Sequence, residues 1–179
     1  MSEHYSRAAT GGTGAAKCGG NYAASLLAQA EASAQGCDQV AFLDAAEHRW
    51  LEEMGGMNMM FVFEDGSLLT PPLGGTILPG ITRNSLITLA GAAGLRVREE
   101  AYSFQQLRED AASGRLREAF ACGTAAVVTP IGKFKFSGGE VVIGDGAHAG
   151  ATTKSLKDRL VQIQRGQSDD PYGWVHRVG

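Results

Sequence analysis

The spacing of hydrophobic positions alternates along the chain between a helical and an extended period, which predicts a mixture of helices and strands. Small and apolar residues recur at three- and four-residue steps over 21–35, with Asn21 as a possible N-cap and Gly36 as a stop signal. Similar patterns predict helices from Thr82 or Asn84 to Gly94, from Ser103 to about Gly114, and over about 153–165.

Short apolar runs bounded by turn residues predict the strands. Residues 59–64 and 67–70 flank the pair Asp65-Gly66, which is typical of two strands joined by a tight turn. Further strands are expected over 39–43, 95–101, 120–128 and 140–143. Because helices and strands alternate without a repeat and two strand runs form a hairpin, we predict an α+β domain with a mixed sheet.

The length and charge of the chain narrow the range of functions. A chain of 179 residues is long enough for one domain with its own core, and its net charge of -3 comes from interspersed signs. No basic stripe or polybasic run is present in the sequence, so neither nucleic acid nor an anionic membrane surface is an expected partner. We therefore expect a small-molecule ligand.

The cysteines and the hydropathy favour a cytoplasmic protein without a metal site. Cys18, Cys37 and Cys122 include no CxxC pair and have no histidine spaced for zinc, so we expect reduced thiols. Residues 1–13 lack the apolar core of a signal peptide, and no later stretch approaches the ~18 to 20 apolar residues that span a bilayer.

Four short motifs follow one another along the chain. They are Lys17-Cys-Gly-Gly-Asn-Tyr22, Glu53-Met-Gly-Gly-Met-Asn58, Leu78-Pro-Gly-Ile-Thr-Arg83 and Cys122-Gly-Thr-Ala125. In this order and at these spacings the sequence resembles the branched-chain amino acid aminotransferases, which are fold-type IV enzymes that depend on pyridoxal 5′-phosphate (PLP). The resemblance extends through Ile163-Gln-Arg-Gly166. It implies a D-amino acid aminotransferase-like large domain, in which helices flank a mixed sheet or pseudo-barrel.

Lys17 stands among small residues in the loop before the first expected helix. Taken alone, a lysine beside glycines is most often a solvated loop residue. The resemblance implies instead that Lys17 forms the internal Schiff base with PLP and later moves a proton between the substrate α-carbon and the cofactor. One amine can serve both steps, because the neutral form is a nucleophile and a general base.

The resemblance also assigns two side chains to the cofactor ring. Tyr22 would lie near the phenolic oxygen of PLP, although alone it is typical of a half-buried tyrosine at a helix start. Glu53 would face the pyridine nitrogen, where a carboxylate keeps that nitrogen protonated. Glu52 is the alternative. We prefer Glu53 because it precedes Asn58 by the five residues that the family keeps, and Glu52 would then point to the other side of the strand, toward solvent.

Two glycine-containing turns are expected to bind anions. The turn Gly80-Ile81-Thr82 precedes a predicted helix, so its unpaired N–H groups and the Thr82 hydroxyl suit an anion, although Pro-Gly-Ile-Thr alone indicates a plain turn and N-cap. The resemblance implies that Ile81 and Thr82 bind the cofactor phosphate. It implies that Thr124 in the second turn also binds phosphate and that Thr124 and Ala125 meet the substrate carboxylate.

The implied reaction transfers the amino group of leucine, isoleucine or valine to 2-oxoglutarate through PLP. Amino acids and 2-oxo acids would be the small-molecule partners, and the full-length family would form a homodimer. The alternatives are a non-catalytic cofactor-binding or oligomerisation module, and other activities of the fold, namely D-amino acid aminotransferase or aminodeoxychorismate lyase. The motif from Glu53 to Asn58 fits the branched-chain subgroup better.

Members of the family carry a small N-terminal domain before the domain with the lysine. Residues 1–16 are polar and small, so we expect them to be a linker remnant of that domain, followed by the PLP-binding large domain over 17–179. The small domain would supply an arginine to the cofactor phosphate and apolar walls to the substrate. We expect nothing in residues 1–16 to replace these groups.

Overall fold

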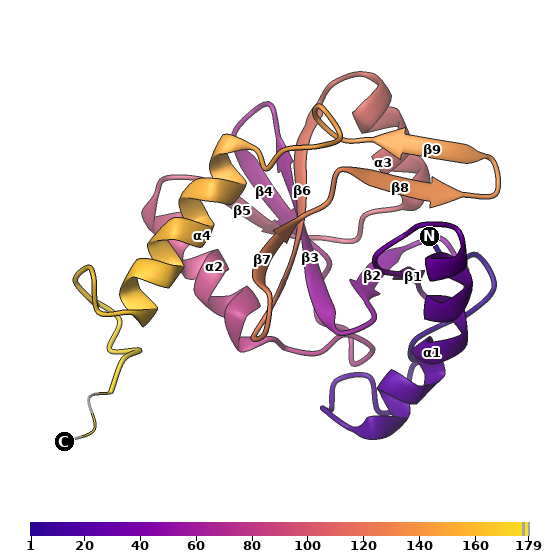
Figure 1. The fold of residues 1–179 in the computed structure, drawn as a ribbon, viewed down its shortest axis with the longest axis horizontal. Helices are drawn as coiled ribbons and strands as arrows, with labels where there is room; N and C mark the ends of the chain where they lie inside the picture. The colour runs from indigo at the N-terminus through magenta and orange to yellow at the C-terminus, as the bar shows by residue number, and fades with distance from the viewer. Residues whose placement is uncertain (177, 179) are drawn as a thin grey trace.

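A mixed sheet of seven strands forms the centre of the molecule in the computed structural model, which describes residues 1–176 and 178 (Figure 1). Its strands are β1 (Ala41–Leu43), β2 (Leu51–Met54), β3 (Met57–Phe63), β4 (Ser67–Thr70), β5 (Arg96–Glu99), β6 (Leu116–Gly123) and β7 (Val127–Pro130). β3 is central, because β6 pairs along one edge while β2 and β4 share the other. The β4–β5 pair is parallel and the other pairs described are antiparallel, which confirms the predicted α+β fold with a mixed sheet.

Side chains of β3 alternate between the two faces of the sheet, and both faces are covered. The covering elements are α2 (Ile81–Ala92), α3 (Phe104–Ala112), α4 (Ala151–Gln164), β8 (Lys133–Phe136) and β9 (Gly139–Val142). Met60 and Val62 pack on the side of α2 and α4, whereas Met59 and Phe61 pack on the side of α3 and the β8–β9 hairpin (Figure 1). Burial on both faces explains why residues 59–63 of β3 form a continuous apolar run.

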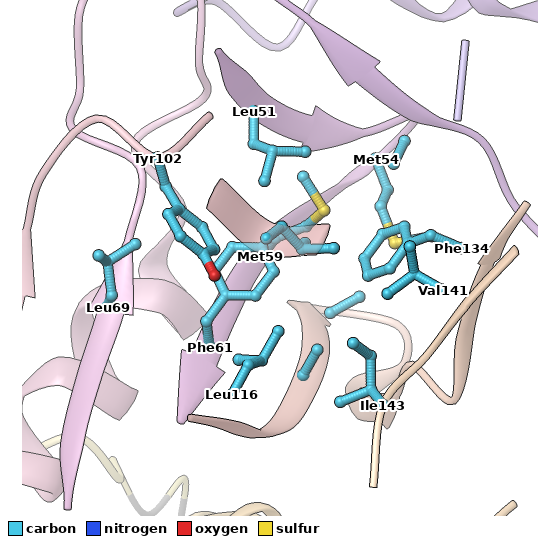
Figure 2. Packing of buried hydrophobic residues seen from close by; sticks show 14 of the residues in the cluster. Leu51, Met54, Met59, Phe61, Leu69, Tyr102, Leu116, Phe134, Val141 and Ile143 are labelled. Carbon is cyan, nitrogen blue, oxygen red and sulfur yellow. The ribbon is translucent and has the colours of Figure 1, made fainter. Parts of the chain in front are cut away.

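The cluster on the α3 side is built around aromatic rings. Phe61 and Tyr102 meet edge to face with their ring centroids 5.1 Å apart, and Phe134 and Ile143 close the cluster from the hairpin side (Figure 2). Burying each large apolar side chain contributes roughly 1.5–3 kcal/mol to stability. The packed sheet therefore supports the ends of β2, β3 and β6, where two of the motifs lie.

α1 (Gly19–Ala34) packs beside β1 through Ala28, Val40 and Phe42. Residues 1–16 form no helix or strand, as expected for a loop, but Ser2 and Arg7 are buried in the body of the domain. The Ser2 N–H donates to the Ala41 carbonyl at 2.9 Å. Throughout residues 1–176, no helix combines the length and the apolar character needed to cross a membrane.

Several elements confirm the sequence prediction. The β3–β4 hairpin turns at Asp65-Gly66, and Gly66 has a φ of 74°, a left-handed conformation that favours glycine. Ser103 and Gln106 form the predicted capping box at the start of α3. α4 covers the range expected for the last helix.

Three local predictions need correction, and two strands were missed. The N-cap of α1 is Cys18, so the assignment of Asn21 as N-cap is wrong, because Gly19 and Gly20 already belong to the helix. α2 begins at Ile81 with Gly80 as N-cap rather than at Thr82 or Asn84. The run 120–128 is not one strand, since a turn separates β6 from β7. β2 and β8 were not predicted, because both are short and carry charged residues.

Candidate functional site

Lys17 lies in an exposed loop immediately before α1, as predicted. This loop is attached to the segment that precedes the Leu78 turn, since the Ala15 N–H donates to the Gly75 carbonyl at 3.0 Å. Gly14 is buried so closely against the backbone of Thr76 that a β-carbon at this position would collide with it. The glycine before Lys17 therefore allows the close approach of two chain segments.

Asn21 holds the shape of the lysine loop from the first turn of α1. Its side chain is buried and donates to the carbonyls of Thr13 at 2.8 Å and Ala16 at 2.7 Å. The Thr13 hydroxyl donates to Asn21 Oδ1 at 2.8 Å. Asn21 therefore fixes the loop on both sides of Gly14, a role that helix-capping rules cannot reveal.

Glu53 is buried at 3% exposure on β2, directly opposite Asn58 on β3. Its Oε1 accepts from the Leu78 N–H at 3.3 Å, and its Oε2 accepts from Asn58 Nδ2 at 3.1 Å. Burial raises the pKa of Glu53 to about 7, and the nearby Arg7 guanidinium opposes this rise. The carboxylate thus lies in a polar but dry environment beside the Leu78 turn.

Arg7 is the principal polar residue near Glu53 that the sequence analysis missed. It is 5% exposed, and its guanidinium lies 2.7 Å from Glu53 Oε1. It also donates to the carbonyls of Gly14 and Thr76, so it joins Glu53 to the lysine loop. Residues 1–16 therefore contribute a buried arginine near Glu53, but its partner is a carboxylate, and the expectation that this segment does not replace the arginine for the cofactor phosphate stays a prediction. No local pattern distinguishes Arg7 from a surface arginine.

The prediction that Glu52 faces solvent is wrong. Glu52 is 7% exposed, and its Oε1 accepts a hydrogen bond from the Thr76 hydroxyl. Burial raises its pKa. Thr76 covers the Glu52 side of β2, which is why this carboxylate is buried as well as that of Glu53. They differ in their partners, since Glu53 rather than Glu52 reaches the Leu78 turn.

The N-terminus of α2 is open to a ligand. Gly80 is its N-cap, no side chain caps it, and Ile81 in the first turn is 80% exposed. The first N–H groups of a helix have no partner within the helix, and the helix dipole makes them favourable for an anion. Asn58 Oδ1 lies against Gly80, where any side chain would collide with it.

The hairpin between β2 and β3 lies close to both Tyr22 and the predicted anion-binding turn at Gly123. The Tyr22 ring, 38% exposed, passes close to Gly56, while Gly123 at the end of β6 packs against Met57. Thr124 and Ala125 follow Gly123 and are exposed. These contacts bring Tyr22 and the β6–β7 turn to the end of the sheet that bears Glu53.

One end of the sheet therefore brings together the Glu53 carboxylate, the Lys17 loop, the Leu78 turn and the β6–β7 turn. The hollow of about 810 Å³ between α3 and the β8–β9 hairpin is lined by other residues, such as Arg108 and Phe136, and contains none of the predicted site. Within the part of the chain that the structure describes, no group of three or more His, Cys, Asp or Glu side chains is placed to hold a metal ion.

Comparison with known proteins assigns the chain to a family. The sequence model of the family Amino-transferase class IV matches residues 6–134. The chain belongs to this family. This class IV aminotransferase chain is 53% identical over 181 residues to the branched-chain-amino-acid aminotransferase of Mycolicibacterium smegmatis, covering 99% of the chain and 49% of that protein. It is 52% identical over 178 residues to a probable branched-chain-amino-acid aminotransferase of Streptomyces coelicolor, again covering 99% of the chain and 49% of the relative.

Solved structures confirm the fold of this class IV aminotransferase chain. It matches the branched-chain amino acid aminotransferase from Escherichia coli with a TM-score of 0.80 and 34% identity, over 97% of the chain and 54% of that structure. It matches a second branched-chain amino acid aminotransferase, solved with pyridoxamine 5′-phosphate, with a TM-score of 0.81 and 32% identity, over 96% of the chain and 52% of that structure. The chain spans about half the length of the curated relatives that it matches.

Proposed function

We propose that this chain is the cofactor-carrying part of a PLP-dependent branched-chain amino acid aminotransferase. The observation that supports this most directly is the connection from Glu53, through Asn58 and Leu78, to the uncapped N-terminus of α2. A buried carboxylate at a fixed distance from an anion-binding helix end suits a flat cofactor with a basic ring nitrogen and a phosphate.

The side chains present fit PLP in chemical type. Lys17 would hold the cofactor covalently, Glu53 would face the ring nitrogen, and Tyr22 would donate to the phenolic oxygen. The phosphate would bind to the N–H groups of Ile81 and Thr82 and to Thr124. When bound, PLP supplies a ring that withdraws electrons from the substrate α-carbon.

The side chains of the chain itself have distinct tasks in this proposal. Lys17 takes the proton from the substrate α-carbon, and its exposed loop gives the amine room to move. Glu53 would keep a proton on the ring nitrogen, because a carboxylate beside that nitrogen favours its charged form. Arg7 favours the charged form of Glu53 and so limits the rise in its pKa that burial causes.

Leucine, isoleucine or valine would donate the amino group, and 2-oxoglutarate would accept it. Thr124 and Ala125, exposed on the β6–β7 turn, would meet the substrate carboxylate. We further propose that residues 17–179 are the PLP-binding large domain, that 1–16 remain from a linker to a small domain, and that full-length chains form a cytoplasmic homodimer. The half-length match to the relatives supports the division into domains.

A half-reaction tests this function without the second substrate. The purified chain is loaded with PLP and mixed with L-leucine or D-leucine, and the 2-oxo acid formed per cofactor is measured. We expect formation with L-leucine and its absence in Lys17→Ala. Formation only with D-leucine would instead support a D-amino acid aminotransferase, and PLP binding without either product would support a non-catalytic module.

A further inference from the structure

Asn58 connects the Glu53 carboxylate to the turn that begins α2. Asn58 is 4% exposed, and its amide nitrogen donates both to Glu53 Oε2 at 3.1 Å and to the Leu78 carbonyl at 2.9 Å. An amide has two N–H donors, so both are used. Glu53 Oε1 in turn accepts from the Leu78 N–H at 3.3 Å, which closes a ring of hydrogen bonds between one carboxylate and one peptide segment.

The other side of the Asn58 amide is also constrained. Its Oδ1 lies against Gly80, the N-cap of α2, so closely that only a glycine fits there. In the sheet, Asn58 pairs with Glu53 on β2 and with Cys122 on β6. Cys122 directly precedes the Gly123-Thr124 turn. The Asn58 side chain therefore touches the carboxylate and the turn before α2, and its backbone pairs with the residue that precedes the β6–β7 turn.

We propose that Asn58 is a positioning residue that fixes the Glu53 carboxylate relative to the phosphate-binding end of α2. The site can then bind the ring nitrogen and the phosphate of PLP at the same time. The proposal rests on the proposed function. Asn58 acts through Glu53 and the Leu78 turn and does not itself meet the cofactor. An amide suits the task better than an acid, because it donates to a carboxylate without adding charge.

Two substitutions separate positioning from simple packing. Asn58→Ala removes both donated hydrogen bonds. Asn58→Asp keeps the shape but replaces the donor with an oxygen, so two carboxylates face each other. The charged and titratable groups around them are Arg7 and Glu52 on the Glu53 side, and Cys122 with Arg83 on the opposite side. Ser103→Ala is the matched control, because it removes a buried helix cap whose partner is Gln106 on α3 and not a residue of the site.

The measurements are the dissociation constant of PLP and the pH midpoint of the visible absorption of the lysine-bound cofactor. We expect Asn58→Ala to weaken PLP binding roughly 10- to 100-fold, as for a lost hydrogen bond to a charged group, and to shift the pH midpoint. In a Glu53→Gln background, Asn58→Ala should shift the midpoint no further. Pyridoxal, which lacks the phosphate, should lose less affinity than PLP.

For Asn58→Asp, PLP affinity relative to the wild type should fall as pH rises, because the protonated acid introduced by this substitution still donates, whereas two ionised carboxylates repel. Ser103→Ala should lower the melting temperature and leave both measurements unchanged. The proposal is overturned if Asn58→Ala behaves like Ser103→Ala, or, should Asn58→Ala not fold, if Asn58→Asp binds PLP with the pH dependence of the wild type. Failure of the wild-type chain to retain PLP on Lys17 after borohydride reduction would reject the proposed function itself, before any variant is compared.

Discussion

Glu52 and Glu53 are neighbours on β2, yet their carboxylates have different partners. Glu53 reaches Arg7, Asn58 and the Leu78 turn, whereas Glu52 reaches Thr76. We expect Glu53→Ala to slow the half-reaction with L-leucine far more than it weakens PLP binding, because the charge is needed mainly when negative charge develops on the substrate. Glu52→Ala is the matched control. A large loss of rate in Glu52→Ala, with an unchanged rate in Glu53→Ala, would reverse the assignment.

The raised pKa of Glu53 makes stability depend on pH. Because this pKa rises from an ordinary 4.5 to about 7, the folded chain binds the proton more tightly than the unfolded chain does. The Glu53 contribution to the free energy of unfolding is therefore present at low pH and lost as pH rises through about 7, by up to roughly 3 kcal/mol.

Urea unfolding of the PLP-free wild type and Glu53→Gln at pH 5 and pH 8 measures this effect. The free energy of unfolding of the wild type minus that of the variant should be smaller at pH 8. A difference that is the same at pH 5 and pH 8 would mean that folding does not raise the pKa of Glu53.

At the scale of elements, the N-terminus of α2 depends on Gly80. Asn58 Oδ1 lies where the side chain of any other residue would project, so Gly80→Ala must displace either Asn58 or the first turn of α2. We expect this variant to lose affinity for PLP by roughly ten-fold or more and to lose less for pyridoxal. Gly91→Ala within α2, where a β-carbon meets open space, is the matched control. Equal affinity of both variants for PLP would contradict the role of this helix end.

Most helices and the β3–β4 hairpin could be predicted because their information is local. Ser103 and Gln106 of the capping box are close together in the sequence, and Asp65 and Gly66 of the hairpin turn are adjacent. β2 could not be predicted, because Glu52 and Glu53 interrupt its apolar pattern and are tolerated only through partners elsewhere in the chain. β8 does alternate lysine and phenylalanine, but it is only four residues long.

The candidate site was predictable only as separate motifs. Lys17, Glu53, Ile81, Thr82 and Thr124 could be named from the resemblance, but their placement at one end of the sheet depends on long-range pairing. The Arg7–Glu53 ion pair joins residues 46 positions apart, and nothing local marks Arg7 as buried. The role of Asn58 likewise requires the pairing of β3 with β2 and β6.

At the scale of the whole molecule, the site is open to water on the side of Lys17. Lys17, Ile81, Thr124 and Ala125 are exposed, and Tyr22 is 38% exposed. Exclusion of water strengthens electrostatic interactions in an active site, so turnover by this chain alone is expected to be slow. Binding of PLP does not need a closed site, and it therefore tests the account more directly than turnover does.

Borohydride reduction of the PLP-loaded chain, followed by proteolysis and mass spectrometry of the peptides, locates the cofactor. The account predicts a pyridoxyl group on Lys17 and its loss in Lys17→Ala. Lys133, which pairs with Glu140 on the hairpin, and Lys154, on α4, are internal controls. A label on Lys133 or Lys154 with Lys17 unmodified would contradict the assignment of Lys17 as the residue that holds the cofactor.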